Sequence, residues 1–93
     1  MRTLQASSSI SRAVTNVADT WSPNKSGTKV YRYISDRNTH IAVTMSGRDA
    51  THDDLRVPAE CAEFIRVDPG EAVSFIRDDA DVDGTVWLTL QDS

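Results

Sequence analysis

The sequence predicts an all-β fold: a small antiparallel β-sandwich or barrel, jelly-roll-like, with about seven short strands. Three observations favour this class. No long stretch places its apolar side chains at helical spacing. Short runs rich in β-branched and aromatic residues recur instead, at intervals of roughly 8–12 residues. Clusters of Gly, Pro, Asn, Asp and Ser, which favour turns, separate these runs.

Length and composition indicate one soluble domain spanning residues 1–93. Hydrophobic residues make up 39% of the chain, which argues against disorder. Cys61 is the one cysteine, so no disulfide can form within the chain, and a reducing compartment such as a cytoplasm is expected. No apolar run approaches the roughly 20 residues of a membrane helix, and the N-terminus lacks the apolar core of a signal peptide.

Weak strand patterns open the chain. Thr3–Ala6 is a possible first strand, and Ile10–Val17 follows with weak alternation of apolar and polar residues. The segment Trp21–Gly27 contains Pro, Asn, Ser and Gly, so it is expected to be a loop.

Two stronger strands follow. Thr28–Ser35 and Thr39–Met45 are rich in β-branched and aromatic residues. Only Asp36–Asn38 separates them, so they are expected to pair as a β-hairpin. Tyr31 and Tyr33 share one face of the first strand and its aliphatic residues share the other. With the aliphatic face toward the core, both tyrosines are predicted to point outward.

The second half predicts a polar loop, an edge segment and three strands. The loop is Ser46–Asp54, and Pro58 is tolerated in the segment Leu55–Ala59 because an edge strand needs no donor there. The three strands are expected to form an antiparallel meander: Glu60–Val67, Ala72–Arg77 and Thr85–Leu90. Asp68–Gly70 is a turn in which Pro69 presets the backbone angle and Gly70 accepts a positive φ.

The acidic turn Asp78–Gly84 contains the best match to a metal-binding motif. Three alternating carboxylates followed by glycine fit the first half of a calcium loop; they are Asp79, Asp81 and Asp83. The full loop needs a glutamate at its twelfth position, where this chain has Leu90. The three aspartates are therefore weak metal candidates, a solvated acidic turn is the main interpretation, and no cofactor is expected.

No residue pattern predicts catalysis. His40 lies on the outward phase of its strand and His52 in a loop, with no spacing that suits a metal. Cys61 has no evident partner base and is expected to be a small core residue. No serine-hydrolase, phosphate-loop or dinucleotide motif is present. The chain is therefore not expected to be an enzyme.

The charge is uneven along the chain. Residues 1–47 contain six Lys/Arg and two Asp/Glu (net +4), and residues 48–93 contain four and twelve (net −8). One interpretation is that the acidic residues lie in loops and aid solubility; the other is two faces of opposite sign that dock on complementary surfaces. Nucleic acid is disfavoured as a partner because the basic residues are scattered and the net charge is −4.

The aromatic side chains supply the candidates for an interface. Trp87 alternates with Val86 and Leu88, so it is predicted to point away from the core. Exposed Trp and Tyr side chains commonly anchor protein interfaces. The interface candidates are Trp87, Tyr31, Tyr33 and Trp21. The alternative is that the phase is reversed, or that loops cover this face.

Residues 28–91 resemble small virion proteins of tailed bacteriophages, and the likeness is best over 55–76. It lies in Ala50–Ala59, in the strand–turn–strand Glu63–Ile76 (EFIRVDPGEAVSFI) and in Gly84–Val86. It is a pattern of strands and turns, not a catalytic signature. The acidic turn at 78–83 is longer than the usual turn of such proteins.

The resemblance implies a capsid decoration (cement) protein made in the host cytoplasm. Such a protein would sit on the capsid surface of the virion, where it binds and stabilises the shell of major capsid protein. It could also contact copies of itself, as a homo-oligomer on the capsid. Two alternatives stay open: a neck, tail or fibre-base component, and a host-glycan-binding module in which Trp87 or Trp21 stacks on sugars.

Overall fold

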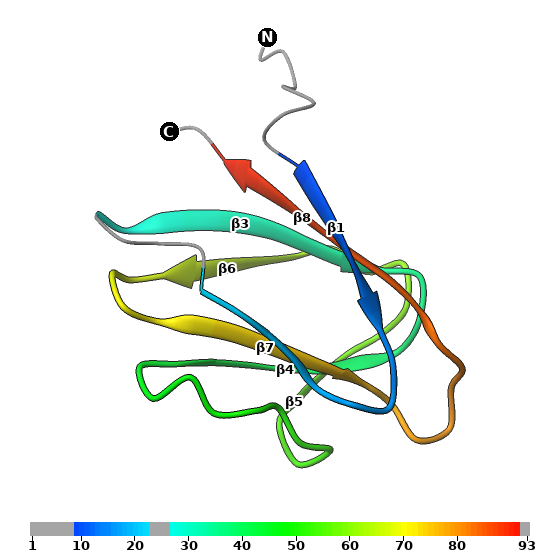
Figure 1. Cartoon of the computed structure of the whole chain (residues 1–93). Helices are drawn as coiled ribbons and strands as arrows, with labels where there is room; N and C mark the ends of the chain where they lie inside the picture. The colour runs from blue at the N-terminus through cyan, green and yellow to red at the C-terminus, as the bar shows by residue number, and fades with distance from the viewer. Residues whose placement is uncertain (1–8, 23–26, 92–93) are drawn as a thin grey trace, which may run out of the picture.

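The computed structural model describes residues 9–22 and 27–91, which form eight strands in two four-stranded sheets. Sheet A has the order β1-β8-β3-β6 and sheet B the order β2-β7-β4-β5, and the two lie as facing layers (Figure 1). The strands are β1 (Ser9–Val14), β2 (Asp19–Trp21), β3 (Lys29–Ser35), β4 (Thr39–Thr44), β5 (Leu55–Val57), β6 (Glu63–Val67), β7 (Ala72–Arg77) and β8 (Gly84–Gln91). No helix in the described part of the chain could cross a membrane.

The connectivity is that of a jelly roll. Every strand pair is antiparallel, and the pairs are nested, so that β1 pairs with β8, β2 with β7, β3 with β6 and β4 with β5. This nesting places consecutive strands in opposite sheets at nearly every step, as in a double Greek key. The predicted all-β sandwich is therefore confirmed. The described residues hold one strand more than the seven expected because β2 was not predicted, and the predicted strand Thr3–Ala6 lies outside them.

The predicted hairpin and meander are wrong. Strands β3 and β4 lie in opposite sheets, and the chain also changes sheet between β6, β7 and β8. Packed sheets are about 10 Å apart, a gap that three extended residues can span. Asp36–Asn38 makes this crossing and is fixed at both ends: Asp36 N donates to Thr85 O (3.2 Å), and Asp78 N donates to Asn38 O (2.8 Å).

Two local predictions in the second half are confirmed. The turn after β6 closes with Glu71 N donating to Asp68 O at 3.0 Å, and Gly70 has a φ of 87°. This is the positive φ that a type II turn requires at its third position. Strand β5 is an edge strand, paired only with β4, and Pro58 follows it. Cys61, by contrast, is exposed and not the small core residue expected.

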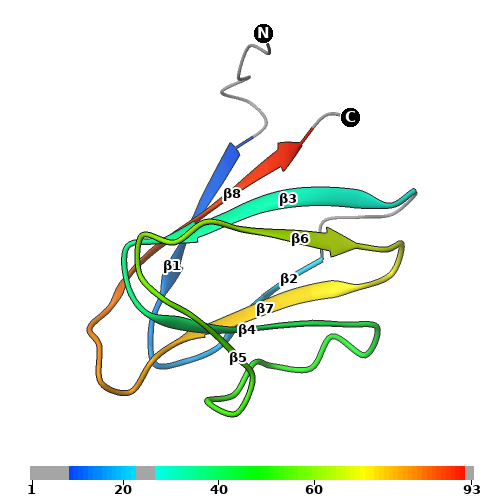
Figure 2. The same cartoon turned by 180° about the vertical axis from the view of Figure 1, so that it is seen from behind.

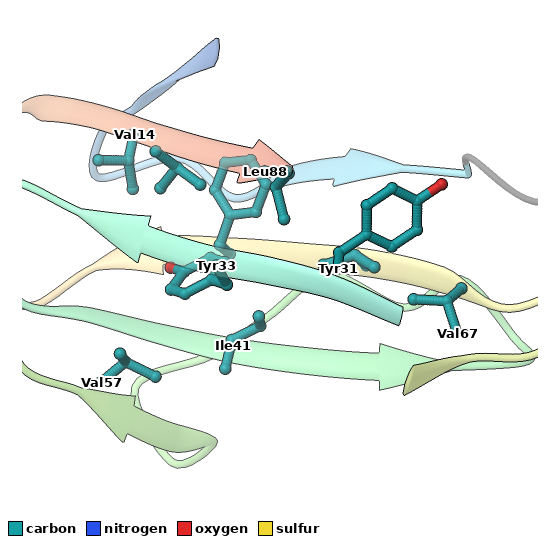
Figure 3. Packing of buried hydrophobic residues seen from close by; sticks show 10 residues of the cluster. Val14, Tyr31, Tyr33, Ile41, Val57, Val67 and Leu88 are labelled. Atoms are coloured by element: carbon teal, nitrogen blue, oxygen red, sulfur yellow. The ribbon is translucent and has the colours of Figure 1, made fainter. Parts of the chain in front are cut away.

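Tyr31 and Tyr33 belong to the core, which corrects the prediction that they point outward. Their exposed fractions are 8% and 0%, and Figure 3 shows them with Leu88 among the buried side chains between the sheets. Tyr33 Oη lies 2.5 Å from Thr39 Oγ1, which satisfies two buried hydroxyls across the two sheets. Burial raises the pKa of Tyr33 to about 12, although the hydrogen bond to Thr39 opposes this shift.

Candidate functional site

The outer face of sheet B is covered by the chain itself. The loop at residues 46–54, here called the covering loop, runs outside this sheet between β4 and β5 (Figure 2). Its Ala50 is buried against Ala42 and Ile76, which point outward from β4 and β7. Ala50 N donates to Ser74 Oγ at 2.8 Å, so the loop is held by both apolar and polar contacts. Little of this face is left for a partner.

An ion pair fixes the shape of the covering loop. The Arg48 guanidinium donates to both carboxylate oxygens of Asp54, at 2.7 and 2.8 Å, and Thr51 N donates to the same carboxylate at 2.8 Å. These bonds, that of Arg48 first, lower the pKa of Asp54. The loop thus depends on the ionised carboxylate.

Asp54→Asn is expected to destabilise the protein by about 1 kcal/mol at neutral pH because it removes the charge that Arg48 binds. The folded-state pKa of Asp54 lies below the unfolded value of about 3.9, so its contribution is present above that value and is lost as pH falls below it. Urea denaturation at several pH values checks this. The difference in free energy of unfolding between wild type and variant should become progressively smaller below about pH 4. An unchanged difference there would contradict the stabilising role of the ionised Asp54 carboxylate.

His40 and His52 come together, although no spacing in the sequence predicts that they lie near each other. Their ring centroids are 5.5 Å apart. His40 lies on the outward side of β4 as predicted, but the covering loop buries it. Its Nδ1 lies 3.0 Å from Asp54 O, and its Nε2 lies 3.0 Å from Asp78 Oδ2. Both of its ring nitrogens face acceptors, so His40 ties the covering loop to the acidic turn.

The three weak metal candidates contact three different partners. Asp79 lies 3.2 Å from His52 Nε2, Asp83 lies 2.9 Å from Arg77 Nε, and Asp81 accepts from Asn38 N at 2.7 Å. In residues 9–22 and 27–91, no three His, Cys, Asp or Glu side chains are grouped so that they could hold a metal ion. The carboxylates of the acidic turn therefore fix the turn to its neighbours.

The outer face of sheet A is open. Its side chains form four rows across the strands, because residues paired in an antiparallel sheet point to the same side. The rows are Ala13 and Thr85; Ser11, Trp87 and Ile34; Ser9, Thr89, Arg32 and Phe64; and Gln91, Val30 and Arg66. Three large apolar side chains in these rows are well exposed: Phe64 (64%), Trp87 (40%) and Val30 (37%). We call this surface the open face.

Of the four predicted interface residues, Trp87 lies on the open face. Trp21 is partly buried in sheet B, where its ring packs edge-on against Tyr31 with centroids 5.2 Å apart. Tyr31 and Tyr33 are core residues, as described above. The open-face residues that sequence reasoning missed are Phe64, Ile34, Val30, Arg32 and Arg66.

The charge of the open face is positive. Arg32 and Arg66 point outward from β3 and β6, and Arg66 Nε lies 3.3 Å from Asp68. The two halves of the sequence do not form separate faces, because sheet A takes β1 and β3 from the first half and β6 and β8 from the second. The open face is thus locally basic on a chain of net charge −4.

Comparisons of this chain with protein-family models, with curated proteins and with solved structures find no match.

Proposed function

We propose that this chain is a non-catalytic structural protein that docks on a large protein assembly through the open face. One observation carries the proposal: the chain covers the outer face of sheet B with its own loop but leaves Trp87, Phe64 and Val30 exposed on sheet A. Grouped exposed apolar side chains on a folded domain mark interaction sites. Aromatic side chains among them supply a large contact area with little conformational entropy to lose.

The assembly that we propose is the capsid shell of a tailed bacteriophage, where the protein acts as a decoration protein. The resemblance of residues 55–76 to small phage virion proteins supports this choice. The jelly-roll topology is compatible with it, since this topology recurs in viral capsid domains. It also recurs in lectins and cupins, so the fold alone does not distinguish a capsid protein from these other classes.

Capsid shells purified without this protein test the proposal. Added protein is expected to co-sediment with the shells until each of many equivalent shell sites is filled, and to raise the temperature at which the shells disrupt. Binding of a stable ligand to the folded assembly stabilises it by mass action. Shells that bind the protein but disrupt at an unchanged temperature would contradict cementing. Saturation at one small ring of copies would instead favour a neck, tail or fibre-base component.

A glycan-binding module is the second candidate. The observation that favours it is the presence of hydroxyl groups beside Trp87. Trp87 pairs with Ser11 of β1, and Thr89, two residues further along β8, points to the same side of the sheet. A flat indole beside hydroxyl groups suits the stacking of a sugar ring. Binding to a glycan array that is lost in Trp87→Ala would favour this function over docking on a shell.

A further inference from the structure

Arg32 differs from the other arginines that the structure describes. Six of the seven arginines within residues 9–22 and 27–91 contact a protein acceptor; they pair as Arg12 with Asp19, Arg37 with Asp83 O, Arg48 with Asp54, Arg56 with Asp78, Arg66 with Asp68 and Arg77 with Asp83. Within the same residues, the Arg32 side chain has no hydrogen bond or ion pair. Its guanidinium donors thus have no acceptor among the described residues and can bind another molecule.

The position of Arg32 places it in the middle of the open face. It lies on β3, an inner strand of sheet A, and pairs with Thr89 on one side and with Phe64 on the other. Trp87 pairs with Ile34, two residues along the same strand, so it is a diagonal neighbour of Arg32. Diagonal neighbours on a sheet are within reach of long and aromatic side chains. The unpaired cation thus sits between the two exposed aromatic side chains.

Docking on the open face would remove Arg32 from water. A buried charge without a partner is strongly unfavourable, so an apolar partner alone would be rejected. The planar guanidinium matches a carboxylate with two parallel hydrogen bonds. A nucleic-acid phosphate is a poorer fit, because among the described residues the open face offers two cations, Arg32 and Arg66, and the chain as a whole is acidic. The charges therefore favour a protein carboxylate.

We propose that the open face recognises an Asp or Glu side chain flanked by apolar side chains on the surface of a partner protein. Arg32 binds the carboxylate, and Trp87 and Phe64 pack on the apolar neighbours. This rests on the proposed function in so far as both use the open face. The acidic character of the rest of the chain repels such a partner elsewhere, which orients docking toward Arg32.

Two short peptides test the carboxylate: one alternates leucine and aspartate, and the other carries asparagine in place of aspartate. The two tryptophans serve as reporters in ¹H–¹⁵N NMR spectra, because Trp87 lies on the open face and Trp21 packs against Tyr31. The aspartate peptide is expected to shift the Trp87 indole signal, to leave that of Trp21 in place, and to bind about fivefold more tightly than the asparagine peptide. If neither peptide moves the Trp87 signal, the proposal is wrong.

Substitutions identify the residue responsible. Arg32→Gln should abolish the preference for the aspartate peptide, and Arg32→Lys should keep part of it because the charge remains. Arg66→Gln is the matched control, since Arg66 is already paired with Asp68 and should contribute less. A preference that survives in Arg32→Gln overturns the proposal. Equal binding of both peptides to the wild-type protein also overturns the carboxylate proposal, but it is consistent with docking through the open face. Docking on a capsid is tested separately, by the experiment with purified shells.

Discussion

Phe75→Ala is expected to lower the free energy of unfolding by about 3–5 kcal/mol. Phe75 is fully buried on β7, an inner strand of sheet B, and its ring faces that of Tyr33 in sheet A with centroids 6.3 Å apart. Truncation would leave a cavity between the two layers that their strands cannot close without moving. A small domain has a total stability of about 5–15 kcal/mol, so a large part of the variant would be unfolded at physiological temperature.

Phe64→Ala is the matched control, because it makes the same chemical change at the other phenylalanine of the chain, which is 64% exposed. Its effect on stability is expected to stay within about 0.5 kcal/mol. Urea denaturation followed by circular dichroism measures both variants. Equal losses of stability would show that the Phe75 ring does not hold the two sheets together.

The fold class could be predicted because its signals are local. The strand-forming residues of Thr28–Ser35 and the turn chemistry of Asp68–Gly70 act within a few residues, and the strand and the turn are both confirmed. Strand pairing is different. A polar connection of three residues suits a hairpin and a crossing between sheets equally well, so Asp36–Asn38 could not be assigned from its own residues. Its course is fixed by contacts with Thr85 and Asp78, both far along the chain.

The phase of β3 was predictable, although the aliphatic residues suggested the wrong face. Arg32 alternates with Tyr31 and Tyr33, and arginine is seldom fully buried. Arg66 also indicates the outward side of β6, where Phe64, two residues away, points to the same side of the sheet. Placing the two arginines outward would have assigned both tyrosines to the core and Phe64 to the surface.

The covering loop could not be predicted as a cover. Ser46–Asp54 is polar and was expected to be a loop, and Ala50 is its one buried apolar residue. Its place on sheet B depends on Ser74, which is 24 residues away and accepts from Ala50 N. No local pattern in the sequence predicts such a contact. The distinction between a covered and an open face, on which the proposed function rests, therefore required the three-dimensional structure.

Trp87→Ala is expected to weaken binding to capsid shells by about 2 kcal/mol, or roughly 30-fold, while the protein stays folded. The indole lies on the open face with Ile34 beside it and Arg32 diagonal to it, so docking would enclose it near the centre of the contact. Residues in that position carry most of the energy of an interface. Truncation in the free protein removes the cross-strand contacts with Ile34 and Ser11, each of which contributes at most about 1 kcal/mol to stability.

Leu55→Ala separates the open face from exposed apolar surface in general. Leu55 is 68% exposed on β5, at the edge of the other sheet, so its truncation removes comparable apolar surface away from the open face. Shell binding measured by co-sedimentation should fall for Trp87→Ala and stay within about twofold of wild type for Leu55→Ala, in line with a neutral surface substitution. Similar losses for both variants would mean that binding is non-specific. Full binding by Trp87→Ala would show that the open face does not contact the shell. The sugar-binding alternative would then be tested with the same variant.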